Sequence, residues 1–149
     1  MRSLVLPFSL LAALTLAACG SSGKSVDGTL FQGTATVTVA AAPCAACDPA
    51  STVAIAVSAS GVSPKTVSVP GNGCGCIAFT NDDTAPHQIV SSPYPNNTDC
   101  PDLNMPSGGI TTGKSFTARM TLTVAKSCSW YDALNLPPVG GGGGGGGGY

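Results

Sequence analysis

The stretch GVSPKTVSVPGNGCGCIAFTNDDTAPHQIVSS, residues 61–92, decides the fold class. It contains three short runs rich in β-branched and aromatic residues, KTVSVP at 65–70, CIAFTN at 76–81 and HQIVSS at 87–92. Proline, glycine and asparagine separate these runs, and these residue types favour turns. Short runs of this composition, divided by turn residues, predict β-strands.

The same pattern continues on both sides of this stretch. Residues 29–41 alternate threonine with alanine or valine, residues 51–60 repeat the alternation, and residues 114–124 place every second apolar residue on one face. Residues 92–109 show no periodicity and are rich in proline, asparagine and glycine, which predicts a loop. About seven strands at this spacing predict an all-β fold, a Greek-key β-sandwich or barrel.

The first residues predict export and lipidation. A short positive start is followed by an apolar run that is too short for a stable membrane span and ends in LAAC at 16–19. This ending resembles the lipobox of bacterial lipoproteins, which implies that Cys19 is lipidated and becomes the mature N-terminus. Gly20 favours the outer over the inner membrane. An ordinary secretory signal with a chance cysteine is the alternative.

The 149-residue chain therefore divides into four parts. Residues 1–18 are the expected signal peptide, 19–29 a flexible tether, 30–138 the folded domain and 139–149 a glycine-rich disordered tail. Nine consecutive glycines near the end have no side chains to bury, which predicts that the tail does not join the core.

Charge and composition narrow the possible partners. Charged residues make up 9% of the chain, and all seven acidic residues are aspartates. Once the leader is removed, five basic residues remain, and the net charge is about −2. Without a basic patch, nucleic acid is not an expected partner. The one partner that the sequence predicts is the membrane, through a lipid on Cys19 in the cell envelope.

Residues 61–135 resemble the cupredoxin pattern. The run NDDTAPH at 81–87 matches the cupredoxin segment that ends in the first copper ligand, so His87 falls on that histidine. The runs TDCPDLN at 98–104 and CSWYDALN at 128–135 resemble a bacterial cupredoxin-like subgroup. The resemblance implies a cupredoxin-like fold and, in that subgroup, a copper site.

The chain departs from that subgroup at the copper ligands. Tyr94 stands where the subgroup has a histidine, and Tyr131-Asp132-Ala133 stands where it has His-Asp-His. His87 is the sole histidine, whereas a blue-copper centre needs two imidazoles and a thiolate. The resemblance thus implies a degenerate site in which residues 128–135 keep a loop shape without metal. Tyr131 and Ala133 would then occupy positions where imidazoles converge on His87.

Two interpretations of His87 follow. It is either a retained histidine with a structural hydrogen bond, or a residual metal ligand that works with Cys128 and with Met105 or Met120. Within the loop expected at residues 128–135, Trp130 should fill space, and Asp132 and Asn135 should hold the turn through hydrogen bonds to backbone amides.

The cysteines predict disulfides. Six remain after Cys19, and an even number in an exported domain favours cross-links. The cupredoxin-like resemblance implies that Cys100 pairs with Cys128, which would withdraw the Cys128 thiolate from any metal site. The sequence leaves three alternatives for the other four cysteines: disulfides, a zinc site or a redox pair. It does not say which of them pair with each other: Cys44, Cys47, Cys74 and Cys76.

No catalytic constellation is apparent, so we do not expect an enzyme. Asp82 and Asp83 suit a turn, and Asp99 and Asp102 suit backbone capping. The function predicted is a lipid-anchored, non-catalytic structural or binding module without a cofactor. The alternative is a copper-binding or electron-transfer protein with an atypical site around His87. A thiol oxidoreductase that uses CAAC at 44–47 is a weaker third hypothesis, because no helix is expected to follow it.

Overall fold

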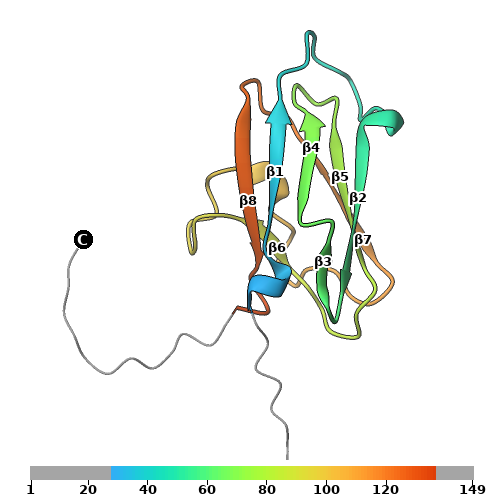
Figure 1. The fold of residues 1–149 in the computed structure, drawn as a ribbon, viewed down its shortest axis with the longest axis vertical. Coiled ribbons are helices and arrows are strands. Elements are labelled where there is room, and N and C mark those ends of the chain that lie inside the picture. The colour runs from blue at the N-terminus through green and yellow to red at the C-terminus, as the bar shows by residue number, and fades with distance from the viewer. Residues whose placement is uncertain (1–27, 137–149) are drawn as a thin grey trace, which may run out of the picture.

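The computed structural model describes residues 28–136, which form an all-β sandwich (Figure 1). The predicted signal peptide, Cys19 and the glycine-rich tail lie outside the described residues. Three single-turn 3-10 helices accompany the strands: η1 (Gly28–Phe31), η2 (Pro49–Ser51) and η3 (Pro101–Leu103). Within residues 28–136 the strands number eight: β1 (Gly33–Thr38), β2 (Thr52–Ser58), β3 (Gly61–Ser63), β4 (Thr66–Pro70), β5 (Cys76–Asn81), β6 (Ile89–Ser91), β7 (Ser115–Arg119) and β8 (Lys126–Asp132).

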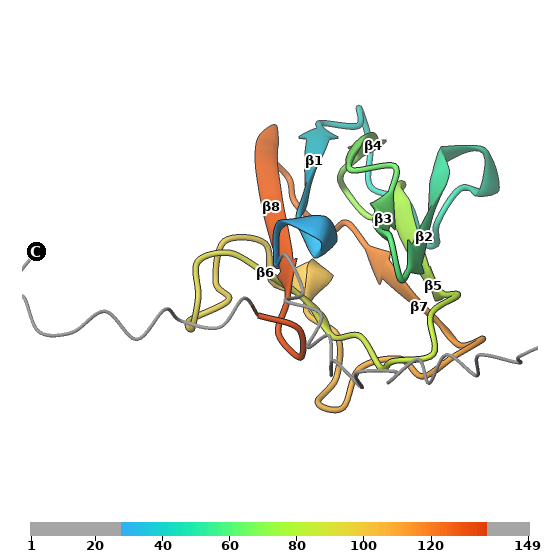
Figure 2. The same ribbon diagram turned by 60° about the horizontal axis from the view of Figure 1, so that its bottom comes forward.

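Two mixed sheets of four strands face each other (Figure 2). One sheet has the order β4-β1-β8-β6 and the other the order β3-β2-β5-β7. Each contains one parallel pair, β1 with β4 and β2 with β5, and all its other neighbours are antiparallel. The predicted all-β sandwich is confirmed. Within the described residues the two sheets do not join into a closed barrel, so the barrel alternative is wrong.

The core lies between the sheets, and the alternation seen in the sequence places it there. In β1, Ala35 and Val37 are buried while Thr36 and Thr38 are exposed, as the period of two requires. The largest buried side chain, Trp130 of β8, meets Phe79 of β5 edge-on at 5.7 Å between ring centroids. This contact joins the centres of the two sheets.

Residues 126–132 form a full strand, which corrects the expectation that residues 128–135 keep a loop. β8 pairs with β1 on one side and with β6 on the other, so long-range pairing fixes it as a central strand. Only Ala133 and the residues after it turn away from the sheet. The space-filling role expected of Trp130 is confirmed, since 1% of this residue is exposed.

Other strand boundaries also move. β7 ends at Arg119, five residues before the expected end, and the amide of Met120 bonds to the carbonyl of Gly75 outside the regular ladder. β6 covers only three residues. His87 lies outside it and forms an isolated bridge with Ile110.

Three cysteine pairs lie at disulfide distance. Cys44 pairs with Cys74 and Cys47 with Cys76, so two cross-links hold the segment between β1 and β2 against the start of β5. Cys100 lies opposite Cys128 with 5.8 Å between their Cα atoms, the pairing that the cupredoxin-like resemblance implies. This third pair ties the start of η3 to the central strand β8.

Candidate functional site

His87 is fully buried between two carboxylates. Its Nδ1 lies 2.6 Å from Oδ2 of Asp132, and its Nε2 lies 3.1 Å from Oδ2 of Asp83. The ring of Phe31 packs against the imidazole at 4.7 Å between centroids. Both ring nitrogens therefore have carboxylate partners, which satisfies a polar side chain that burial would otherwise destabilise.

Asp132 connects this cluster to the turn after β8. Its Oδ1 accepts hydrogen bonds from the backbone amides of Gln88 at 2.9 Å and Leu134 at 3.0 Å. The expectation that Asp132 holds the turn through backbone amides is thus confirmed. Asn135 acts differently from expectation, because its side-chain amide donates to Oδ2 of Asp132 and to the carbonyl of Pro86.

Asp83 occupies a shielded turn position. Burial raises the pKa of its carboxyl group, but the Thr84 amide hydrogen bond and the hydrogen bond and charge of His87 together outweigh burial, and the net direction of the pKa is downward. The turn predicted for Asp82 and Asp83 is present, since the Asp83 amide bonds to Oδ1 of Asn81 at 2.8 Å.

The residues considered as copper ligands have other partners in this structure. Cys128 lies at disulfide distance from Cys100, and a disulfide sulfur is not a thiolate ligand. The sulfur of Met105 accepts a hydrogen bond from the Ile89 amide at 3.3 Å, and Met120 is buried in the core. Residues 28–136 contain no cluster of three or more His, Cys, Asp or Glu side chains arranged to hold a metal.

Tyr131 does not lie beside His87, which corrects the arrangement expected from the resemblance. Asp132 takes that place, and successive residues of a strand point to opposite faces, so the Tyr131 side chain lies on the other face of β8. There it meets Tyr94 at 5.9 Å between ring centroids, with the rings at 75°. The two tyrosines that stand at histidine positions of the subgroup thus contact each other.

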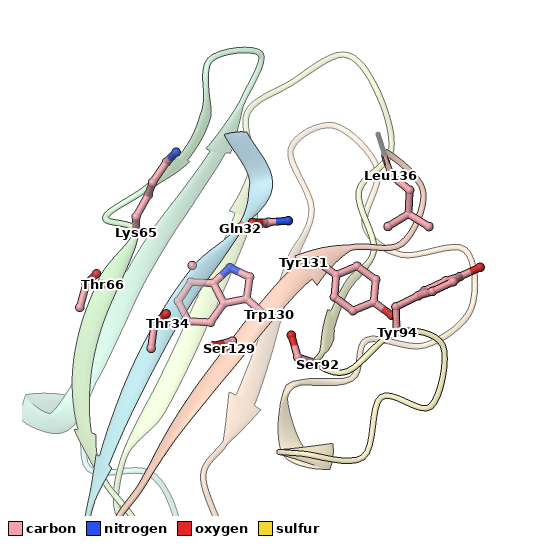
Figure 3. Close-up of a pocket in the computed structure, with 11 residues that line it drawn as sticks. Gln32, Thr34, Lys65, Thr66, Ser92, Tyr94, Ser129, Trp130, Tyr131 and Leu136 are labelled. Carbon is pink, nitrogen blue, oxygen red and sulfur yellow. The ribbon is translucent and has the colours of Figure 1, made fainter. Parts of the chain in front are cut away.

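These tyrosines line a surface cavity of about 640 Å³, which we name the Tyr94 groove (Figure 3). The groove crosses the outer face of the sheet over β4, β1 and β8 and reaches the loop after β6. Most of its exposed surface is apolar, and several of its lining residues carry hydroxyl or amide groups: Gln32, Gly33, Thr34, Lys65, Thr66, Ser92, Tyr94, Ser129, Trp130, Tyr131 and Leu136.

Tyr94 is the exposed aromatic side chain of the groove. It is 66% exposed, whereas Tyr131 beneath it is 7% exposed. The Tyr131 hydroxyl donates a hydrogen bond to the side-chain oxygen of Asn97. Burial, and to a smaller extent the neighbouring Tyr94, raises the pKa of Tyr131 above its ordinary value. Tyr131 is therefore a neutral hydrogen-bond donor to Asn97, and its ring packs against that of Tyr94 in a T-shaped contact.

The loop that carries Tyr94 is fastened at several points. The Ser92 amide bonds to the Ser129 carbonyl at 2.9 Å, and the Asp99 amide returns to the Ser92 carbonyl at 2.9 Å. Lys126 forms an ion pair with Asp99 at 2.6 Å, which gives Asp99 a partner that the sequence did not predict. Cys100, the residue after Asp99, lies at disulfide distance from Cys128 and ties the loop to β8. An exposed ring on a fastened loop loses little conformational entropy when a ligand binds.

Trp130 contributes an unsatisfied donor below the groove. Its indole Nε1 has no hydrogen-bond partner in the described part of the chain, and leaving a buried donor unpaired costs about 1–3 kcal/mol. Figure 3 shows this nitrogen on the Gln32 side of the groove. The indole fits because residue 33 is glycine, since a Cβ there would lie 2.2 Å from Trp130 Cζ2.

The sequence singled out Tyr94, Tyr131 and Trp130, but it did not predict that they share a groove. The lining from β1 and β4 was missed altogether. The available signal was the run of threonines on the face of β1 opposite its valines. Asp102, which lies outside the groove lining, caps a backbone amide as expected, since it accepts from the Thr121 amide at 2.6 Å and from the Thr121 hydroxyl.

No protein-family model and no curated protein matches this chain. No helix within residues 28–136 is long and apolar enough to cross a membrane. The case for function accordingly rests on the groove and on the His87 cluster.

Proposed function

We propose that this chain is a lipid-anchored binding module of the cell envelope, and that it binds its ligand in the Tyr94 groove without catalysis. One observation carries the proposal: a 640 Å³ cavity on the outer face of a sheet has a mostly apolar surface, an exposed aromatic side chain at one end and several hydroxyl groups along it. Cavities of this size that combine aromatic contacts with a few polar groups are typical of ligand sites.

The chemistry around the groove supports binding over catalysis. Several hydroxyl groups line it, but a serine or threonine nucleophile needs a neighbouring general base. The sole imidazole, on His87, does not line the groove and is enclosed by Asp83 and Asp132. No carboxylate is among the lining residues either.

Copper binding around His87 is the competing proposal. It would require the Cys128 sulfur to be released from Cys100, and one His87 ring nitrogen to exchange its carboxylate partner for the metal. Each step removes an interaction that stabilises the fold. We therefore favour the groove as the functional site.

A fragment screen on the purified full-length chain by two-dimensional NMR tests the proposal. We expect fragments to shift backbone resonances around Ser92, Tyr94 and Ser129, and these shifts to vanish in Tyr94→Ala. Because Tyr94 is largely exposed, this variant should keep the fold and the thermal midpoint. Val124→Ala removes an exposed apolar side chain outside the groove lining and should leave binding unchanged.

Two results would overturn this assignment. One is a set of fragment shifts that gather away from the groove or survive Tyr94→Ala. The other is stoichiometric copper in the purified protein that disappears in His87→Ala, which would move the functional site to the competing position.

A further inference from the structure

We propose that the Tyr94 groove accommodates a neutral oligosaccharide, an inference that rests on the proposed binding function and names its ligand class. Saccharides present flat C–H faces and rings of hydroxyl groups on the same molecule. The groove presents a matching combination, an exposed aromatic ring beside a row of hydroxyl side chains (Figure 3).

The polar groups of the lining are suited to a ligand with hydroxyl groups. Besides the two tyrosines, four serine and threonine hydroxyls and one side-chain amide line the groove, and each can donate and accept a hydrogen bond. An alkyl chain placed over them would remove their water without replacing its hydrogen bonds, which is unfavourable. The hydroxyl groups of a polyol replace these hydrogen bonds to water. The groups concerned are Thr34, Thr66, Ser92, Ser129 and Gln32.

The charge of the lining favours a neutral ligand. No acidic side chain lines the groove, so a cation would find no counter-charge. Lys65 is the single charged residue among those that line it, and it lies at the end away from Tyr94 in Figure 3. Lys65 also has an interaction within the protein. One amine at the margin does not form an anion site.

The tyrosines provide the apolar contact. Tyr94 is 66% exposed, and the ring of Tyr131 packs against its ring in a T-shaped contact with 5.9 Å between the centroids. A ring supported in this way can stack on the C–H face of a sugar without reordering, because its loop is already fastened to β8. Leu136 extends the apolar surface at the same end.

The extent of the groove predicts more than one sugar unit. Its lining runs from β4 across β1 to β8 and on to the loop that carries Tyr94. Neighbouring strands lie about 4.8 Å apart, so the path from β4 to β8 alone covers about 10 Å. A chain of two or three sugars laid across the strands fits this length.

Emission from Trp130, the sole tryptophan, tests the inference directly on the full-length chain. The neutral probes are maltotriose, cellotriose, mannotriose, laminaritriose and triacetylchitotriose. The comparison probes are trigalacturonate, decanoate and tetra-alanine. We expect at least one neutral trisaccharide to change the emission saturably. Tyr94→Ala should weaken that binding about tenfold or more, whereas Tyr94→Phe, Lys65→Gln and Val124→Ala should keep it within about threefold.

The outcomes separate the two proposals. If NMR fragments bind the groove but no neutral saccharide does, the saccharide inference is wrong and the binding function stands. Tighter binding of trigalacturonate that is lost in Lys65→Gln would show an anion site, and equal binding of decanoate or tetra-alanine would show an unselective apolar or peptide site. Each of these overturns the inference. If no fragment and no saccharide binds, both proposals fail.

Discussion

At the level of single residues, Asp132 gives the buried His87 imidazole a structural partner. The carboxylate lies 2.6 Å from Nδ1 of His87 and also accepts two backbone amides, so it fixes the imidazole and the turn after β8 together. The sequence predicted the turn, because aspartate commonly accepts amides a few residues away. It did not predict the pairing with His87, which joins residues 45 positions apart.

Removing the imidazole should therefore destabilise the domain. His87→Gln removes the imidazole from Oδ2 of the buried Asp132 carboxylate, which then keeps only amide donors, and losing a hydrogen bond to a charged group costs about 1.5–3 kcal/mol of unfolding free energy. Urea unfolding measures the loss. The matched double variant His87→Gln with Asp132→Asn removes the charge as well and should recover part of it. Equal losses in the single and double variants would show that the charge pair contributes nothing.

Asp83 should make the domain sensitive to acid. The folded state holds the pKa of Asp83 below its ordinary value, so the unfolded state takes up the proton first as the pH falls. The contribution of Asp83 is fully present above pH of about 4 and is lost as the pH falls through the lowered folded value.

Thermal unfolding measured between neutral and acidic pH checks this. Asp83→Asn should be less stable than the parent at neutral pH, and the difference should shrink under acid. The exposed neighbour Asp82 provides the control variant Asp82→Asn. A difference between Asp83→Asn and the parent that stays constant down to pH of about 2 would contradict the expectation.

At the level of elements, the strands that the sequence predicted well are those with a clear period of two. β1, β2, β4 and β5 lie within their predicted ranges because their β-branched and aromatic residues, which alternate with smaller or polar residues in β1, β2 and β4, fit the face of a sheet. β8 was taken for a loop because its residues matched a ligand motif. Its strand character depends on pairing with β1 and β6, and such long-range pairing leaves a weak local signal.

The Cys100–Cys128 pair should matter for both stability and binding. The two residues are 28 positions apart, and closing a loop of this length is worth about 3–4 kcal/mol in the loop-entropy model. The variant Cys100→Ala with Cys128→Ala should lose roughly that amount in urea unfolding. It should also bind groove ligands more weakly, because the loop that carries Tyr94 loses its covalent anchor.

Peptide mapping without reduction provides the direct check of this pair. It should recover Cys100 linked to Cys128, and thiol titration of the denatured, unreduced domain should find no free thiol among the six cysteines after Cys19. The variant Cys44→Ala with Cys74→Ala is the matched control, because its cross-link lies outside the groove lining. Mapping Cys128 to another cysteine would refute the assignment.

At the level of the whole molecule, composition and periodicity were enough to predict an all-β fold, a sandwich or a barrel, but not to choose between the two. They were not enough to predict the strand order, because the parallel pairs β1 with β4 and β2 with β5 join segments separated by other strands. The Tyr94 groove likewise depends on the pairing of strands that are far apart in the sequence. Its lining comes from positions 32 to 136, and only the assembled sheet brings these residues to one face. The sequence could name the tyrosines but not the surface that they share.

The last prediction concerns the proposed attachment of the whole molecule to a membrane through Cys19, which lies outside the described residues. The apolar run before Cys19 is too short to span a bilayer, so stable attachment would need lipid chains, each buried methylene of which contributes about 0.8 kcal/mol. Cys19→Ser should therefore abolish incorporation of labelled palmitate and move the protein out of the membrane fraction. Ser21→Ala, two residues away, is the control and should stay with the membrane. Palmitate found on the Cys19→Ser variant would place the lipid on another residue, and a variant that stays in the membrane fraction without palmitate would show that the apolar leader itself anchors the chain.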